Sequence, residues 1–236
     1  MRKLKRLLLL IVCIVLGGIG LGEVTPDLHA ATTTISLAQV KKIAYRRYEL
    51  QDGNGKTYDV YIYSDSGKKQ KATWDNGLVW AGAGEGDLLV TGKFKFAYGL
   101  QGSTTLNIYT LPELPGEQTL NLTRPYLKTI HSIESGISDF ATIFIPECSA
   151  GGELYCYAII NGKLKPVTFQ DDEGKSEYIW VMGGPNYFQP LGTGQFRSIE
   201  FYNVGDYAYG LFTWEYNKAN NTMNYLDFEE SINAPY

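Results

Sequence analysis

One short strand pattern recurs four times along the chain at a nearly fixed interval. Its central residues are Tyr61, Tyr109, Tyr157 and Phe212, which are separated by 48, 48 and 55 positions. A second apolar run precedes each copy, and a turn that contains glycine lies between the two runs. Glycine adopts positive φ at little steric cost, so such turns suit antiparallel neighbours. The period indicates one supersecondary unit repeated along the chain, and we predict four β-hairpins.

The residues after each hairpin indicate a third strand per unit, at 72–74, 120–122, 167–169 and 225–228. The strand formers are aromatic or β-branched, and the 18 tyrosines fit a half-buried pleated surface. Residues 36–43 fit one or two helical turns or the entrance of a strand equally well. We therefore predict an all-β fold of four repeated antiparallel units that is propeller-like, with a two-sheet β-sandwich as the alternative.

Two local features refine this prediction. Asn161-Gly162, between two apolar runs, is the clearest hairpin signal in the chain. The segment 32–37 precedes the first unit and reads as an additional strand. In a closed ring it would pair with the last unit near Tyr225 and so remove an exposed sheet edge.

The N-terminus has the pattern of a secretory signal peptide. Four basic residues lie within residues 1–6, an uncharged and mostly apolar run follows from 7 to 22, and Ala30 completes a small-residue cleavage site. We predict a signal peptide over 1–30 and one all-β domain over 31–236. The expected location is therefore extracellular, with no stable membrane anchor after cleavage. An uncleaved N-terminal membrane anchor is the alternative.

The charge of the mature chain argues against a nucleic-acid partner. Removing residues 1–30 takes away four of 21 basic and two of 25 acidic residues, which leaves a formal charge of −6. No basic cluster of the kind that follows phosphates remains. Extracellular proteins or glycans are the expected partners.

Two cysteines remain after cleavage, Cys148 and Cys156, and they flank the turn of the third hairpin. In an exported protein, an even pair in this position predicts a disulfide. The alternative is a pair of buried thiols.

The inventory of catalytic residues is small. The mature chain has one histidine, His131, so a multi-histidine metal site is excluded, and we expect no metal and no cofactor. Carboxylates are the remaining source of catalysis, because a facing pair can hydrolyse glycosides. Asp139 and Glu200 lie beside strands rather than in polar turns, and they are the candidate pair.

The one irregular interval of the repeat suggests a binding surface. An insertion at 183–194 stretches the last interval from 48 to 55 residues. Insertions in repeat folds collect on one face, often the binding face. Trp180 leads into this insertion, and Tyr187, Phe188 and Gln189 lie within it. These four residues are the predicted ligand contacts.

The first unit resembles a TolB-type β-propeller repeat over residues 41–73. The similarity consists of an Ile-Ala-Tyr strand at 43–45, the Asp-Gly-Asn-Gly turn at 52–55, the Asp-Val-Tyr strand at 59–61 and an Ala-Thr exit at 72–73. Propellers of this kind bind protein or glycan partners or hold enzyme sites, so the resemblance implies a fold more than an activity. We predict a secreted, non-enzymatic binding or scaffold protein. The alternative is a secreted carbohydrate-active hydrolase that uses a carboxylate pair.

Overall fold

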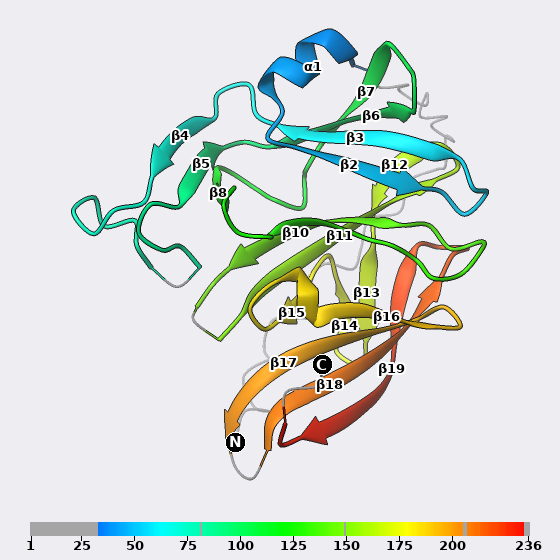
Figure 1. The fold of residues 1–236 in the computed structure, drawn as a ribbon. Helices are drawn as coiled ribbons and strands as arrows, with labels where there is room; N and C mark the ends of the chain where they lie inside the picture. Colours follow the sequence, from blue (N-terminus) through cyan, green and yellow to red (C-terminus); the bar gives the residue numbers. More distant parts are fainter. Residues whose placement is uncertain (1–32, 81, 149, 205–206, 234–236) are drawn as a thin grey trace, which may run out of the picture. The chain divides into compact units, whose positions relative to one another are not determined.

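The structure is a computed structural model that describes residues 33–80, 82–148, 150–204 and 207–233. Strands dominate these residues, and nearly all of them pair antiparallel, so the all-β prediction is confirmed (Figure 1). The predicted signal peptide at 1–30 lies outside the described residues. Within the described part of the chain, no helix has the length and apolar character needed to cross a membrane.

The N-terminal sheet has the strand order β1-β7-β6-β3-β2. Its strands are β1 (Thr34–Ser36), β2 (Arg46–Gln51), β3 (Thr57–Tyr63), β6 (Lys95–Leu100) and β7 (Thr105–Thr110). Helix α1 (Leu37–Ile43) follows β1 and begins at a capping box, in which the Ser36 hydroxyl accepts from Gln39 N. Val40 of α1 is fully buried against Tyr61, Tyr63 and Ala97, so the helix covers the outer face of this sheet.

A three-stranded sheet is formed by two strands between β3 and β6 and one strand after β7. It contains β4 (Lys68–Lys71), β5 (Leu88–Gly92) and β8 (Gln118–Asn121), in that order. Strand β4 lies at the edge and all four of its residues are exposed. Its lysines place charge along an unpaired edge, which opposes the addition of further strands.

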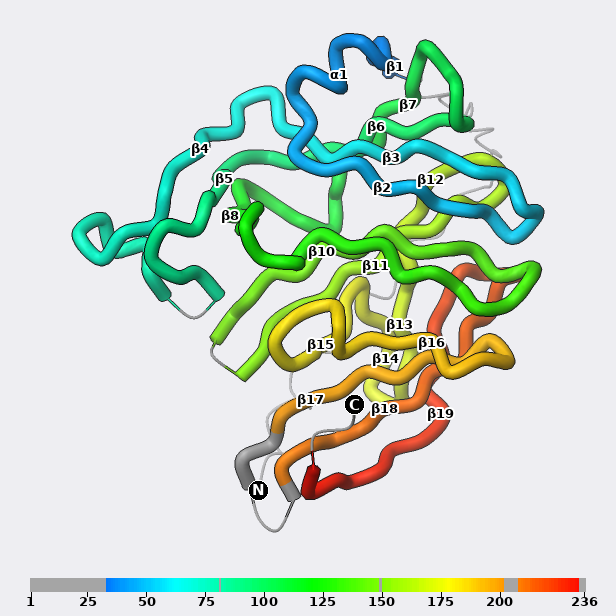
Figure 2. Tube along the Cα trace, in the orientation of Figure 1, coloured from blue at the N-terminus to red at the C-terminus, as the bar shows by residue number. Residues whose placement is uncertain are grey.

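The central sheet consists of the antiparallel meander β12-β11-β10-β9, with β15 beside β11. Its strands are β9 (Leu127–Ile130), β10 (Phe140–Pro146), β11 (Gly152–Ile160), β12 (Lys163–Pro166) and β15 (Ile179–Val181). Every residue of β10 is buried. Ala141, Ile143 and Ile145 belong to the core shared with the N-terminal sheet, whereas Phe140 and Phe144 belong to the core shared with the C-terminal sheet. The central sheet is therefore covered on both faces (Figure 2).

The C-terminal sheet has the order β14-β13-β19-β18-β17-β16. Its strands are β13 (Thr168–Asp171), β14 (Gly174–Ser176), β16 (Phe188–Gly192), β17 (Gln195–Val204), β18 (Tyr207–Asn217) and β19 (Thr222–Ser231), and the 3₁₀ turn η1 (Pro185–Tyr187) precedes β16. Strands β13 and β19 pair in parallel, with Phe169 opposite Met223. Phe188 and Phe196 stack at 5.6 Å between ring centroids, so β16 and β17 contribute aromatic side chains to the core.

The four predicted hairpins are all present. They are β2–β3, β6–β7, β10–β11 and β17–β18, and each pairs antiparallel. The Asn161-Gly162 turn also joins β11 to β12 as predicted, with φ of 51° and 76° at the two positions. Positive φ at both positions is what a tight hairpin turn of type I′ requires.

The predicted grouping into four equivalent three-stranded units is wrong in two respects. The first and second hairpins join through β3 and β6 into one sheet instead of forming two. The third strand pairs with its own hairpin in the last unit, where β19 lies beside β18, and in the third unit only through β12, which ends before residues 167–169. Residues 72–74 lie outside any strand, β8 pairs with β5, and β13 pairs with β19 and β14.

The N-terminal strand also differs from its prediction. Ile35 pairs with Leu106 of β7, so β1 extends the N-terminal sheet and does not contact the last unit near Tyr225. The sequence 36–43, which fitted helix or strand, forms α1 because Ser36 and Gln39 supply a helix N-terminus.

The predicted disulfide requires correction, because Cys148 and Cys156 are free thiols. Cys156 is buried in β11 and lies opposite Thr142, whereas Cys148 follows the end of β10. The two positions differ by six residues along the hairpin, roughly 20 Å at the rise of a strand. A disulfide needs Cα atoms within about 7 Å, so the hairpin register keeps the two thiols apart.

Candidate functional site

A cavity of about 470 Å³ lies beside the C-terminal sheet, and we call it the aromatic pocket. Buried Phe169 and Trp214 form part of its lining, and their rings meet edge to face at 5.4 Å. The Trp214 indole N–H donates to the Ser198 hydroxyl at 2.8 Å, which fixes the ring. Two further aromatic side chains, Phe212 and Tyr225, are only partly buried and also line the cavity. The pocket therefore has a rigid aromatic lining that reaches the surface.

Two more aromatic residues come from the segment before and within β15. Trp180 lies in the middle of β15, opposite Glu153 of β11, and Tyr178 precedes the strand by one residue. Both line the pocket, and Tyr178 is 38% exposed. A Cβ atom at Gly151 would lie 2.7 Å from the Trp180 indole nitrogen, so the glycine leaves the space that this indole occupies. Tyr178 and Trp180 are two positions apart and so lie on one side of an extended chain.

The other lining residues are polar and largely acidic. Asp171, Asp172 and Glu173 come from the β13–β14 turn, Ser176 ends β14, and Glu200 comes from β17. Asp171 Oδ1 accepts from Glu173 N at 2.8 Å and from Gly174 N at 3.0 Å, so this carboxylate shapes the turn. Asp172 and Glu173 are exposed. No lysine, arginine or histidine of the described chain lines the pocket, so it is an acidic site.

Such a lining suits a ligand with flat apolar faces and hydroxyl or ammonium groups. Half-exposed aromatic rings offer faces for stacking, and carboxylates accept hydrogen bonds from hydroxyl groups. Because the described lining holds no cation, the exposed carboxylates of Asp172 and Glu173 are open to a ligand. The volume falls within the range of small-ligand sites.

The structure places the predicted carboxylate pair in two different environments. Glu200 lines the aromatic pocket, whereas Asp139 does not. Asp139 is 8% exposed and accepts from Gln51 N and Ser132 N, both at 2.9 Å, so its carboxylate holds two chain segments together. The two carboxylates therefore do not line one cavity, as a glycosidase pair that acts on one bond would.

The predicted contact residues are also divided. Trp180 lines the aromatic pocket, as a contact residue would. Phe188 is 2% exposed within the core, so its assignment to a contact surface is wrong. Tyr187 is partly buried against the same core, and Gln189 is exposed with its side-chain amide donating to Asn186 O. Neither of these two lines the aromatic pocket.

Sequence reasoning missed most of the residues that surround Trp180. Tyr178 carried a usable signal, because it alternates with Trp180 two positions away. Phe212 and Tyr225 were placed in repeated strands, and nothing local shows that their rings reach a cavity. The acidic turn at 171–173 and Glu200 line the same cavity because β13 pairs with β19. That pairing joins distant parts of the chain, so no local sequence pattern indicates it.

Comparisons with known proteins found no matching family model, no matching curated protein and no matching solved structure. The resemblance of residues 41–73 to a TolB-type repeat therefore stays a prediction.

Proposed function

We propose that this protein is an exported, non-enzymatic binding protein that holds a carbohydrate chain in the aromatic pocket. The single observation that carries the proposal is the combination of partly exposed Trp180, Tyr178 and Tyr225 with carboxylates in one cavity. Sugar rings have an apolar face and a hydroxyl-bearing edge, and this lining complements both. The basic and apolar pattern of residues 1–30 supports export.

The acidic lining favours neutral sugars and amino sugars over uronic acids. Asp171, Asp172 and Glu173 form no ion pair within the described residues, so an ammonium group would find uncompensated carboxylates. A uronate would instead meet like charge, which costs binding free energy.

The finer architecture belongs to the same proposal. We infer an open series of three blade-like meanders, β2-β3-β6-β7, β9-β10-β11-β12 and β16-β17-β18-β19, as in part of a propeller. Support comes from the strand orders and from the two cores that join neighbouring sheets. The TolB-type resemblance of the first unit points the same way.

Binding is tested with the chain 31–236 and soluble oligomers of glucose, glucosamine and galacturonic acid in isothermal titration calorimetry. We expect binding of a neutral or amino-sugar oligomer, and a loss of at least about tenfold in affinity for Trp180→Ala, which corresponds to about 1.4 kcal/mol. Trp74→Ala is the matched control, because Trp74 is 73% exposed and does not line the pocket.

A second variant avoids any effect on β15. Asp172→Asn combined with Glu173→Gln changes two exposed side chains, and it should weaken glucosamine binding more than glucose binding. The proposal is wrong if neither the glucose nor the glucosamine oligomer binds, or if Trp74→Ala lowers affinity as much as Trp180→Ala. Release of reducing ends that Glu200→Gln abolishes would identify the hydrolase instead.

A further inference from the structure

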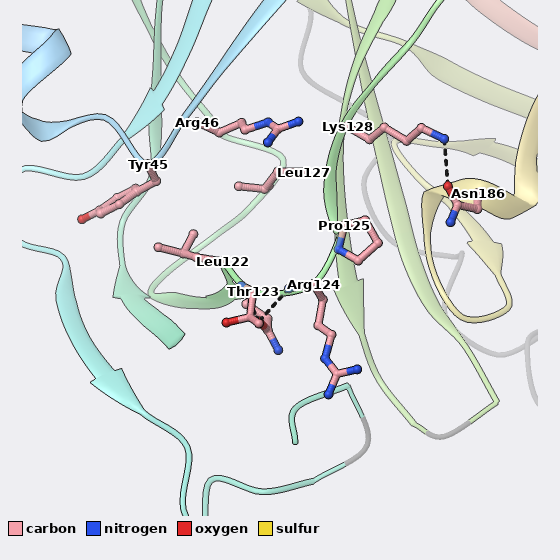
Figure 3. A pocket seen from close by; sticks show the side chains of 10 residues that line it. Tyr45, Arg46, Leu122, Thr123, Arg124, Pro125, Leu127, Lys128 and Asn186 are labelled. Atoms are coloured by element: carbon pink, nitrogen blue, oxygen red, sulfur yellow. Dashed lines mark hydrogen bonds between the residues drawn. The ribbon is translucent and has the colours of Figure 1, made fainter. Parts of the chain in front are cut away.

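A second cavity, of about 440 Å³, has the opposite charge and lies where the β8–β9 loop meets the start of β2 (Figure 3). Arg46, Arg124 and Lys128 line it, together with Tyr45, Asn121 and Asn186 among others. No aspartate or glutamate of the described chain is part of the lining. We call it the basic pocket. Three cations in one cavity stand out in a chain whose formal net charge is −4.

The loop that carries Arg124 is fixed from within. Asn121 is 4% exposed, and its Oδ1 accepts from Thr123 N at 2.9 Å and from Arg124 N at 3.1 Å. Its amide nitrogen donates to Asp87 Oδ2 at 2.8 Å and to Gly82 O at 2.9 Å. Each polar atom of this buried amide is therefore used to hold the loop in shape.

Asp87 forms an ion pair with Arg124 but does not itself line the basic pocket. Arg124 Nε donates to Asp87 Oδ2 at 2.7 Å. Burial alone would raise the pKa of Asp87, but hydrogen bonds from Gly84 N, Arg124 and Asn121 outweigh burial and lower it. The carboxylate thus stays ionised and directs the guanidinium. A Cβ atom at Gly84 would lie 2.6 Å from Arg124 Nη2, so the glycine leaves room for the arginine.

The other two cations are available to a ligand. The Arg46 side chain makes no hydrogen bond or ion pair with the residues that the structure describes. Lys128 Nζ donates to the Asn186 side-chain oxygen at 2.8 Å and makes no ion pair in the described chain. With Asp87 counted against Arg124, the pocket carries a net charge of about +2, which attracts anions.

The charged groups are spread along the cavity and do not converge on one point. In Figure 3 the Arg46 and Arg124 guanidinium groups point in different directions, and Lys128 extends toward Asn186. Groups that point apart suit an extended ligand with acidic groups at intervals better than one small anion, and arginine pairs well with planar carboxylates.

We propose that the basic pocket binds an acidic polysaccharide, with uronate carboxylates on Arg46, Arg124 and Lys128. This site is independent of the aromatic pocket and prefers the opposite ligand charge. The protein would thus contact two chemically different carbohydrates.

The test titrates the chain 31–236 with a galacturonate hexamer, and a glucose hexamer serves as the uncharged comparison. Arg46→Gln combined with Lys128→Gln should lower affinity for the galacturonate hexamer at least about tenfold and should reduce its dependence on salt. Arg124 is left intact, because its loss would strand the buried Asp87. Lys68→Gln combined with Lys71→Gln removes the same charge from exposed positions on β4 and should leave affinity unchanged.

Four outcomes would overturn the proposal. They are no binding of the galacturonate hexamer, equal losses in the two double variants, binding of the glucose hexamer with equal affinity once Trp180→Ala has disabled the aromatic pocket, and preference for polyphosphate or a single-stranded oligonucleotide of matched charge. Trp180→Ala should keep galacturonate binding intact. Failure of the aromatic pocket to bind sugar is therefore distinguishable from failure here.

Discussion

At the scale of single residues, a buried acidic cluster joins the N-terminal and central sheets. The Tyr109 hydroxyl donates to Glu113 Oε1, while Glu113 Oε2 and the Tyr157 hydroxyl have no hydrogen-bond partner among the described residues. Tyr109 and Tyr157 also meet edge to face at 6.2 Å. Burial raises the pKa of Glu113, because the charged form is poorly solvated there.

This raised pKa predicts a stability that depends on pH. The unfolded chain loses the Glu113 proton near pH 4.3, while the folded chain keeps it to higher pH, so stability falls as pH rises through that interval. Glu113→Gln removes the charge and should raise the free energy of unfolding at pH 7 by about 1 kcal/mol. Urea denaturation should show no difference at pH 3.5. Glu117→Gln, at a nearby exposed position, should have no effect, and an equal gain there would contradict the prediction.

Candidate contact residues could be predicted only where a short stretch of sequence carries the signal. The break in the repeat pointed to Trp180, which lines the aromatic pocket, and its role as a ligand contact stays a prediction. Phe188 came from the same break and is buried, because the chain returns through β16 to pair with β17. Which side of a short strand faces a core depends on its partner, and no partner is visible in ten residues of sequence.

At the scale of elements, the four hairpins were predictable and the sheets were not. A hairpin depends on two neighbouring runs and the turn between them, as at Asn161-Gly162. The pairing of β3 with β6 spans β4 and β5, and β13 pairs with β19 across more than 50 residues. These distant pairings decide which acidic turn lies beside Glu200.

Strand β10 supplies a prediction at this scale, because its two faces belong to different cores. Ile143→Ala should cost about 2–5 kcal/mol by opening a cavity toward the N-terminal sheet, and Phe144→Ala about 3–5 kcal/mol on the side of the C-terminal sheet. Chemical denaturation measures both. Gln70→Ala on exposed β4 should stay within about 0.5 kcal/mol. A cost below 1 kcal/mol for either core variant would show that its face of β10 is not packed.

At the scale of the whole described domain, the central sheet connects the two large cores. Loss of either core removes the cover from one face of β10 and β11. We therefore expect one cooperative thermal transition, with calorimetric and van't Hoff enthalpies in agreement.

Differential scanning calorimetry of Phe96→Ala and Phe144→Ala checks this expectation, because the two residues belong to different cores. Both variants should shift the same single transition to lower temperature. Two separated transitions, with each variant moving only one, would show that the cores unfold independently.

The parallel pairing of β13 with β19 has a consequence for how the chain assembles. Strand β19 is the last strand of the structure, and it lies between β18 and β13 in the C-terminal sheet. During synthesis or transport, the N-terminal and central sheets emerge first, while the second face of β10 must wait for its cover. Phe140 stays exposed until Phe196 of β17 and Tyr216 of β18 arrive to pack against it, in a window when nascent chains are prone to aggregate. Pairing of β13 with β19 is a later step, and it joins the β13–β14 hairpin to the rest of the C-terminal sheet.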